Sequence, residues 1–532
     1  MGPGGPLGSA VTLSAGQSLE ASAVTTVGPG GTLELAGGEL ASGGLKLAGG
    51  VLKTSSLTGM GPLEFESGAL VWIGDLEISP SGPLGGAVTL AADQRVQASG
   101  SLRVVGGSLT VAGGAAEASA VEVSAGGAVV LDGGSLTTGG LALAEGSFDW
   151  RQGRLAFTGD LVISPGGPLG ATIEVTGGQT LATSETLRLG DAENAGHVAI
   201  RPGGQVEARR VAADHPQSTL LIDGGTLLAD ELQNFTGATL QWQTGTLSLR
   251  GDAQIAAGQA LGDLVSLSAA QRLEVAGRLA IGGATPGSLV IGAGAVATAG
   301  TLALDDGGAL TLDGGRIQAA TIEMPSGAFQ WNAGVVELTG DLAIVDGAGL
   351  GPALALAGNQ QLQVARTLQI GGAAPGSLSI GAGAVVAADQ VVINAGNLTL
   401  DGGMLTASSM QNQAGGTFSW QSGVLSLTGD VSIGSGEGLA GSLAMVGDQR
   451  LEAAGRLRIG PDGGLSIGAG SSVSAATASI EAGGVLTLAG GELSVASLEP
   501  AAAGAFIWQS GRLVFREGFS VGPGGPLGSA VT

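Results

Sequence analysis

The chain has 532 residues, of which 103 are glycine, none is cysteine or tyrosine, and only 3% are aromatic. So few aromatic residues argue against several ordinary globular domains, whose cores take much of their buried area from aromatic side chains. The mean hydropathy of +0.39 also argues against disorder, which needs low hydrophobicity. Abundant glycine with small aliphatic residues indicates many tight turns around a narrow core.

The formal net charge is −24, and it is spread along the chain. An acidic surface keeps a long particle soluble and disfavours DNA, RNA and anionic membranes as partners. The absence of cysteine excludes disulfides and thiolate metal sites. No apolar run reaches about 18 residues, so we expect no membrane span. The opening "MGPGGPLG" lacks the features of a signal peptide, and any export signal is expected to lie outside this chain.

The stretch "GPGGPLGSAVT" occurs at 2–12 and again, letter for letter, at 522–532. Related stretches at 79–89, 164–174 and 256–266 have diverged from it. Neighbouring copies therefore differ while the two distant copies are identical. This pattern predicts a superrepeat, of which this chain is one full period with uncapped ends.

Two series of landmarks divide the chain into six long repeats of about 87 residues. Glutamine followed by a short apolar alternation recurs at Gln17, Gln94, Gln179, Gln271, Gln360 and Gln449. An aromatic residue in a segment typified by "FDWRQGRLAFTGDLVIS" recurs at Phe65, Trp150, Trp242, Trp331, Trp420 and Trp508. In the first copy, Trp72 falls where Phe157 stands in the second.

Each long repeat contains short strands separated by glycine-rich turns. Residues 331–420 include twelve such pieces, among them "VEL", "LAI", "ALAL", "LQV" and "FSW", each with the period-two alternation of a half-buried strand. At three strands per coil they form four coils of about 22 residues, and two strands per coil is the alternative. Within "GVLSL" we expect Leu425 to point inward and Ser426 outward.

Together these observations predict an all-β fold, a parallel β-solenoid that runs as one domain through residues 1–532. About 24 coils at the strand spacing of roughly 4.8 Å would make a rod on the order of 115 Å long. The narrow core would be built from stacked Leu, Val, Ile and Ala, which accounts for the shortage of aromatic residues.

Two polar landmarks recur once per long repeat. Successive copies would lie four coils, roughly 19 Å, apart, so they cannot form a continuous ladder. We interpret the glutamines as corner residues that bond the backbone of a turn. The aspartates of the "GDL" motif are Asp75, Asp160, Asp252, Asp341 and Asp430, with Gly518 at that place in the last repeat.

Aspartate also precedes paired glycines in the "LDGG" turns at Asp132, Asp313 and Asp401. Aspartate before glycine is ordinary turn chemistry. Calcium binding is the alternative for both sets of aspartates, but the nonapeptide pattern G-G-x-G-x-D is absent. We therefore predict structural turns.

The remaining landmarks have equally simple interpretations. The tryptophans are expected to fill the core or to form an interface between rods, and an exposed platform for carbohydrate is the alternative. Arg250, Gly251 and Asp252 form an adhesion-like tripeptide, which we interpret as a variant of the "TGD" turn. The glycosylation sequons at Asn234 and Asn397 are expected by chance, and His197 and His215 are expected to be surface turn residues. We predict no catalytic, cofactor-binding or metal-binding residues.

The run "GSLTVAGG…LDGGSLTTGGLALAEGSFDW" resembles the glycine-rich repeats of bacterial surface β-solenoids, such as autotransporter passengers and filamentous-haemagglutinin-like adhesins. The resemblance rests on repeat style along the whole chain. It implies an extracellular stalk, adhesin or filament on the surface of a bacterium.

The sequence thus predicts a structural extracellular protein, not an enzyme, that forms a filament with itself. Its partner would be another copy, joined head to tail, with lateral packing of rods as a further contact. One alternative is a surface adhesin passenger whose rod displays a binding surface. Another is a β-helix enzyme that acts on polysaccharides.

Overall fold

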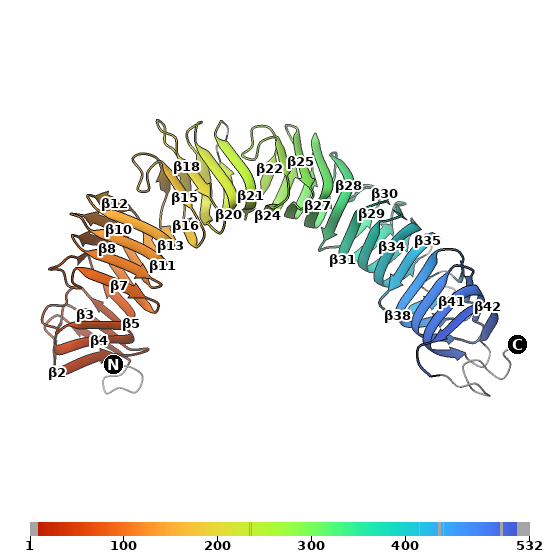
Figure 1. Cartoon of the computed structure of the whole chain (residues 1–532), viewed down its shortest axis with the longest axis horizontal. Coiled ribbons are helices and arrows are strands. Elements are labelled where there is room, and N and C mark those ends of the chain that lie inside the picture. The colour runs from red at the N-terminus through yellow and green to blue at the C-terminus, as the bar shows by residue number, and fades with distance from the viewer. Residues whose placement is uncertain are drawn as a thin grey trace. The chain divides into compact units, whose positions relative to one another are not determined.

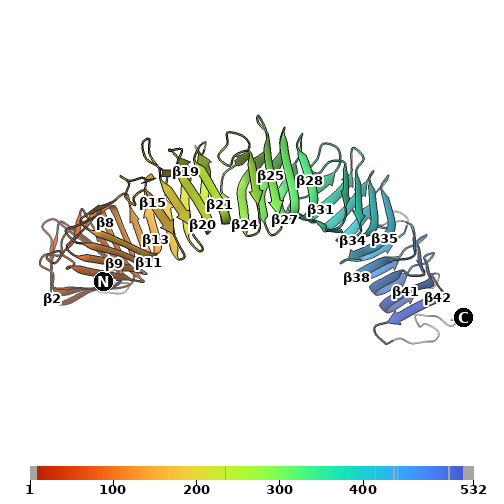
Figure 2. The same cartoon turned by 45° about the horizontal axis from the view of Figure 1, so that its top comes forward.

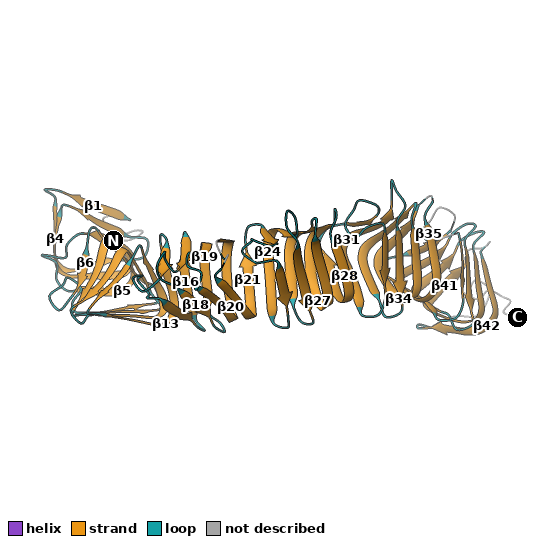
Figure 3. Ribbon diagram, turned by 90° about the horizontal axis from the view of Figure 1, so that it is seen from above, coloured by secondary structure: helices purple, strands orange, loops and turns teal. Residues whose placement is uncertain are grey.

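A computed structural model describes residues 9–233, 235, 237–413, 415–434, 438–439, 441–500 and 504–518. These residues form 42 strands and no helix (Figures 1 and 3). The chain divides into two compact units, Met1–Arg250 and Gly251–Thr532, which are described separately below.

The strands of the first unit are β1 Ala10–Ser14, β2 Ser18–Val27, β3 Thr32–Ala36, β4 Glu39–Thr54, β5 Leu63–Trp72, β6 Leu76–Ile78, β7 Ala87–Ala91, β8 Gln94–Val105, β9 Ser108–Ala112, β10 Ala115–Ser124, β11 Ala128–Thr138, β12 Leu141–Ala144, β13 Ser147–Phe157, β14 Leu161–Ile163, β15 Thr172–Val175, β16 Gln179–Thr183, β17 Thr186–Leu189, β18 His197–Ile200, β19 Gln205–Ala213, β20 Thr219–Gln233 and β21 Thr239–Leu249. Those of the second unit are β22 Ala253–Ile255, β23 Leu264–Leu267, β24 Gln271–Ile281, β25 Gly287–Gly292, β26 Val296–Leu304, β27 Gly308–Glu323, β28 Ala328–Leu338, β29 Leu342–Ile344, β30 Ala353–Leu356, β31 Gln360–Gly371, β32 Ser377–Gly381, β33 Val385–Asn394, β34 Asn397–Asn412, β35 Thr417–Leu427, β36 Val431–Ile433, β37 Ser442–Met445, β38 Gln449–Ile459, β39 Gly464–Gly468, β40 Ser472–Ile480, β41 Val485–Pro500 and β42 Ala505–Phe515.

These strands stack into three parallel faces, numbered here in the order in which a coil visits them. Each coil begins after a glycine corner with a strand on face 1, continues with a strand on face 2 and ends with a strand on face 3. In the coil that follows a landmark aromatic residue, the turn between faces 1 and 2 carries the "GD" motif. In one block of the second unit, face 1 comprises 335–338, 361–364, 385–388 and 404–407, face 2 comprises 342–344, 368–370, 390–393 and 409–412, and face 3 comprises 353–356, 377–380, 397–400 and 417–420.

The chain is therefore a parallel β-solenoid, with about 24 turns at a spacing of about 21 residues. The prediction of three strands per coil is confirmed, since all twelve short pieces expected between 331 and 420 are strands of this block. Figure 2 shows β24, β25, β27 and β28 lying side by side in the second unit. The single continuous domain and the length of the rod remain predictions.

Side chains alternate across each strand because successive Cβ atoms point to opposite faces of a sheet. Leu425 and Leu427 are buried, whereas Ser426 between them is half-buried, which confirms the predicted inward and outward positions. Leu425 pairs with Leu405 of the preceding coil, which is also fully buried. Like residues thus stack on like along the core.

A glycine corner joins face 3 to face 1 in every long repeat. At Gly423 the backbone has φ of +97°, which L side chains rarely adopt. A Cβ atom there would also lie 2.3 Å from the carbonyl oxygen of Gly403 in the preceding coil. Both the conformation and the close stacking of corners therefore require glycine at this place.

The long repeat corresponds to four coils of unequal size. Along face 1, Val335 pairs with Gln361, Gln361 with Val385, Val385 with Met404, and Met404 with Val424. These four steps advance the chain by 26, 24, 19 and 20 residues, so the register returns after 89 residues. The first coil is the widest because it contains the loop that corresponds to the "GPLG" stretch of the other repeats.

The first long repeat departs from the predicted equivalence of the six glutamines. Face 1 passes through 10–14, 32–34, 51–54 and 69–72, whereas the strand after Gln17 pairs on face 2 with the strand that begins at Glu39. The equivalence of Gln17 with the other glutamines was therefore wrong. The first glutamine spacing is the shortest of the series, and the missing length shifts the strands by one face.

Candidate functional site at the boundary between long repeats

Two of the three hydrogen-bonded ladders stop where one long repeat meets the next. After Trp420, the face 1 strand 404–407 continues to 424–427. On faces 2 and 3, strands 409–412 and 417–420 have no ladder partner in the following coil among the residues that the structure describes. The next strands on those faces, β36 and β37, pair with the coil after them.

The same interruption follows Phe65, Trp150 and Trp331. Inside a block, in contrast, consecutive coils pair on all three faces. We call each such interruption a repeat boundary, meaning the step from the coil that ends in a landmark aromatic residue to the coil that follows. Within the described part of 331–480, the repeat boundary is where the otherwise regular stack changes.

A glutamine side chain bridges the repeat boundary at the corner between faces 3 and 1. Gln449 donates a hydrogen bond from Nε2 to the carbonyl oxygen of Trp420, one corner back along the stack, at 2.5 Å. Its Oε1 accepts a hydrogen bond from the backbone N–H of Val446 at 2.6 Å. The amide is 3% exposed, so both bonds are shielded from water. The predicted corner role is confirmed.

The same pair of bonds recurs at the boundaries before it, at Gln94 with Phe65 and Ala91, at Gln179 with Trp150 and Thr176, and at Gln360 with Trp331 and Ala357. Gln271 likewise accepts from the backbone N–H of Ser268. Gln17 makes only the local bond, from Ser14 N–H to its Oε1, among the hydrogen bonds described for it. The bridging bond therefore belongs to the corner of faces 3 and 1.

The landmark aromatic residues fill the space beside the interrupted ladder on face 3. Phe418 and Trp420 pair with Leu398 and Leu400, two fully buried core residues, so they occupy inward positions. Both remain half-buried, because no described strand of the next coil pairs with theirs. Their ring centroids lie 6.0 Å apart. The landmark tryptophans thus occupy inward positions but are only partly covered, and Trp508 in the last repeat is 37% exposed, so their role as core plugs or as an interface between rods stays a prediction.

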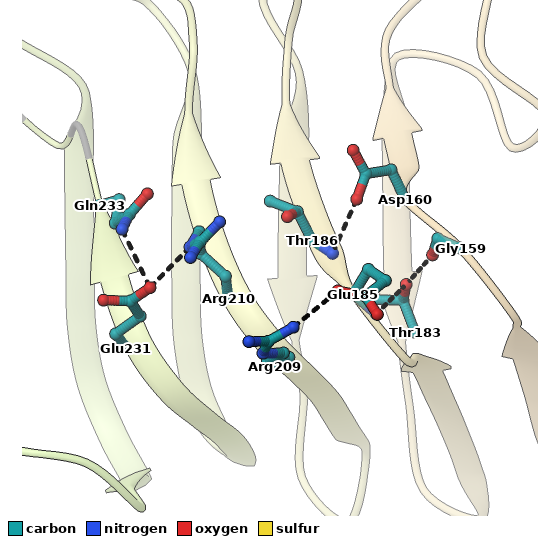
Figure 4. Close-up of polar contacts among 9 residues, drawn as sticks. All are labelled: Gly159, Asp160, Thr183, Glu185, Thr186, Arg209, Arg210, Glu231 and Gln233. Carbon is teal, nitrogen blue, oxygen red and sulfur yellow. Dashed lines mark hydrogen bonds and ion pairs between the residues drawn. The ribbon is translucent and has the colours of Figure 1, made fainter.

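The aspartates of the "GDL" motif cap the backbone of the next coil. Asp160 Oδ1 accepts a hydrogen bond from the N–H of Thr186 at 3.1 Å (Figure 4). Asp75, Asp252, Asp341 and Asp430 make the equivalent bonds to Ser101, Arg278, Thr367 and Arg456. Their interpretation as structural turn residues is confirmed.

Arginines on the outer surface lie between acids of the coils before and after them. Arg188 reaches Asp160 at 3.3 Å and Asp214 at 2.9 Å. The backbone bond from Thr186, followed by the bond from Arg188, lowers the pKa of Asp160. Such exposed pairs are each worth at most about 1 kcal/mol, so they balance charge between neighbouring coils more than they stabilise the fold.

A second set of cross-coil bonds lies at the corner between faces 1 and 2 (Figure 4). Arg209 pairs with Glu185 at 3.1 Å, and Arg210 pairs with Glu231 at 2.6 Å. Gln233 donates to the same Glu231 carboxylate. Each arginine at this corner thus forms an ion pair with a glutamate of a neighbouring coil, so the corner is polar and its charges are paired.

The repeat boundary after Trp150 contains a groove of about 1050 Å³. It lies between the face 2 strand β12 and the "GPLG" loop of the next coil, and its lining includes Leu141, Leu143, Phe148 and Leu169. Leu143 is 45% exposed, although it belongs to a strand. The groove therefore marks the space left by the interrupted ladders.

The "LDGG" aspartates lie at bulges of the ladder and not at isolated turns. Asp132 accepts a hydrogen bond from Gln152 Nε2 at 2.8 Å, and Asp401 accepts one from Ser422 Oγ at 3.1 Å. The following glycines have the left-handed backbone that the turn prediction requires. Within the described part of the chain, no three acids or histidines gather as metal ligands.

The other singled-out residues lie apart from one another. Arg250 pairs with Asp230 at 3.3 Å, as expected for a variant turn. His215 lies in a turn, where its Nδ1 accepts from the N–H of Gln217. His197 was expected in a turn, but it lies in β18 with Nδ1 2.7 Å from Thr219 Oγ1, because the strand begins one residue earlier than the apolar pattern suggests. Asn397 is exposed at the start of β34, and Asn234 lies outside the described residues.

Sequence reasoning located the aromatic residues and glutamines but missed the interrupted ladders beside them. A signal was present in the "GPLG" phase, which adds residues to one coil in four and widens the face 1 step to 26 residues. The strands of a wider coil cannot all lie at the height that pairing with the preceding coil requires. The recurring glutamine could have been linked to that extra length.

No protein-family model matches the chain, and no curated protein matches it. Among solved structures, it is similar to a crystal structure of a TibC-catalysed hyper-glycosylated TibA fragment, residues 55–350. The identity is 15%, the match covers 84% of this chain and 99% of that chain, and the TM-score is 0.15. At this TM-score the likeness carries no argument about function. None of the described segments is an apolar helix of membrane-crossing length.

Proposed function

We propose that this chain is a structural protein of the bacterial cell surface, which forms an extracellular rod that lengthens by end-to-end continuation of β-solenoid blocks. One observation carries the proposal, namely that a long repeat leaves the stack in the register in which it entered. Val335 and Val424 occupy the same place on face 1, and four coils lie between them. A block of this kind can therefore be followed by another of the same register without a change of geometry.

The edge chemistry of a solenoid supports the same function. Each coil presents a row of backbone N–H and C=O groups on both of its edges, and these stay unpaired until a neighbouring coil covers them. A contact between the leading side of one block and the trailing side of another is heterologous and does not close, so it gives open fibres. The two identical copies of "GPGGPLGSAVT", 520 residues apart, agree with a stack that repeats on this larger scale.

The net charge bears on lateral contact between rods, and the repeat style supports an extracellular location. A net charge of −24 makes parallel rods repel at low ionic strength, and salt screens that repulsion. The extracellular location rests on the glycine-rich repeat style, which resembles that of bacterial surface solenoids.

Electron microscopy of the purified chain at increasing concentration tests the proposal. We expect thin, unbranched fibres with an axial repeat on the order of 115 Å, from about 24 coils at strand spacing. A chain that stays monomeric and monodisperse at high concentration would contradict it. Addition of salt should then bring preformed fibres together laterally.

A surface adhesin is the second candidate, and the groove beside Leu143 and Phe148 favours it, since it is a hollow in the side of the solenoid that apolar side chains line together with Asp160 and Asp191. Images of intact cells distinguish the two, because an adhesin would project as single rods. The proposal assigns no catalytic role to the chain. Cleavage of acidic polysaccharides, with or without added calcium, would overturn that part of it.

A further inference from the structure

We infer that the repeat boundaries are yield points, at which the solenoid opens under load in blocks of four coils. The inference concerns the mechanics of a single chain and does not depend on filament formation. It rests on three features of the boundary, which are the interrupted ladders, the loosely filled space beside them, and the glutamine that replaces the missing bonds.

The ladders make the boundary the weakest step of the stack. From 385–400 to 404–420, backbone pairing runs along all three faces. From 404–420 to the next coil, it runs along face 1 alone among the described residues. Load applied along the stack passes through fewer backbone hydrogen bonds at that step than at any step inside the block. The boundary should therefore part first.

The packing of the boundary points in the same direction. The groove of about 1050 Å³ after Trp150 leaves Leu143 and Phe148 without neighbours on one side. Side chains that line such a space lose the dispersion contacts that a stacked coil would supply. Within a block, inward residues such as Leu378 and Leu398 are fully buried between coils. Opening at the boundary after Trp150 thus exposes less apolar area than opening inside a block.

Boundaries are not equally filled, and this predicts an order of opening. In the second unit, the loop leucines Leu350 and Leu439 are 8% and 1% exposed. The N–H of Leu439 also bonds the carbonyl of Ser432. Leu169, the equivalent leucine after Trp150, is half-buried beside the groove. The boundary after Trp150 should therefore open before the boundary after Trp420.

Single-molecule force spectroscopy on the intact chain, held at its two termini, tests the inference. We expect discrete extensions that each release one long repeat, about 87 residues, or roughly 300 Å of chain at 3.3–3.6 Å per residue. Extensions of roughly 70 Å would mean release coil by coil, and one event for the whole chain would mean no yield points. Either of these outcomes would overturn the inference.

The glutamine bridge supplies a matched pair of variants. Gln449→Leu removes both hydrogen bonds at nearly constant volume, and we expect the corresponding block to open about tenfold faster, the effect of bonds of ordinary strength. Gln363→Leu, on an outward position inside a block, should leave every extension unchanged. Equal effects of the two variants would show that the boundary bridge carries no load.

A measurement on the unmodified chain guards against a variant that misfolds. Native-state hydrogen exchange should group the amides into four-coil blocks, with one opening free energy for each block. The limits of the groups should fall at Trp150, Trp331 and Trp420. Groups whose limits fall elsewhere, or a single group for the chain, would contradict the yield points independently of any substitution.

Discussion

Residues 385–400 and 404–420 are joined to one another by ladders on three faces, whereas the described residues of the coil that follows are joined to 404–420 by a ladder on face 1 alone. The sequence changes character where the pairing changes. Inside the block, inward positions carry aliphatic residues of similar size, and the backbone supplies most of the bonding. At the boundary two ladders are interrupted. A tryptophan partly fills the space beside them, and a glutamine at the glycine corner makes hydrogen bonds to the neighbouring backbone.

The comparison explains why the conspicuous residues of this sequence recur at about 87 residues and not at every coil. A regular coil needs only alternation and a turn, and many residues satisfy both. An interrupted coil needs a side chain large enough to fill the added space and an amide long enough to reach the neighbouring corner. Conspicuous residues here mark irregular geometry, and their role is structural.

The largest effect is expected from a charge on face 1, whose ladder continues across the boundary in the described part of the chain. Leu425→Asp places a carboxylate in a fully buried position on face 1 and should destabilise its block by more than about 4 kcal/mol. Ser426→Asp, one residue on and outward, should stay within about 0.5 kcal/mol of the parent chain. Urea denaturation followed by circular dichroism measures both, and similar values would show that the two positions do not face opposite ways.

The next effect concerns the aromatic plug. Trp331→Ala should cost about 2–3 kcal/mol, less than full burial of tryptophan would imply, because the ring is half-buried and stacks on Phe329 at 5.8 Å. The outward neighbour Gln330→Ala serves as the control and should be almost neutral. Thermal unfolding measured by calorimetry checks the pair, and a neutral Trp331→Ala would remove the plug from the account of the boundary.

A smaller effect is expected at the corner glycine. Gly423→Ala forces a Cβ into a left-handed position 2.3 Å from a backbone oxygen and should cost about 1–3 kcal/mol. Gly159→Ala is the matched control, because a Cβ at Gly159 meets no atom within 4 Å. Denaturation midpoints compare the two, and equal midpoints would show that the stacked corners can separate at little cost.

The smallest effect is a dependence on pH through Asp160. Its pKa is lowered in the folded chain, first by the N–H of Thr186 and then by Arg188. The ionised carboxylate therefore adds stability that is fully present above the unfolded pKa of about 3.9 and is lost as the pH falls through the lower folded value. The stability difference between the parent chain and Asp160→Asn should narrow between pH 7 and pH 3 in urea titrations. A constant difference would mean that the charge of Asp160 does not matter.

Much of the fold could be predicted from the sequence because a solenoid is built from local rules. Alternation of aliphatic residues with Ser, Thr and Glu defines each strand, and paired glycines define each turn, so the twelve strands of 331–420 were placed correctly. The repeat of Trp331 at Trp420 set the size of the block. Each of these features depends on residues that are close in the chain, and a single sequence is enough to show it.

The roles of the recurring polar residues could be predicted in kind but not in detail. Spacing alone excluded a ladder of glutamines or aspartates, and a corner role remained. The partners of Gln449 lie 3 and 29 residues away, and no local pattern singles out the carbonyl of Trp420 as the second partner. Gln17 shows the limit, since the same local bond occurs there on a different face.

The sequence by itself thus determined the strands, the turns, the three-strand coil and the period of the long repeat, all of which follow from short-range alternation and glycine conformations. Only the tertiary structure decided which ladders continue across a repeat boundary. Pairing between coils depends on whether strands 19 to 26 residues apart reach the same height on the same face, and a few added loop residues change that height. The wide coil that begins after Gly423 keeps face 1 in step and displaces faces 2 and 3.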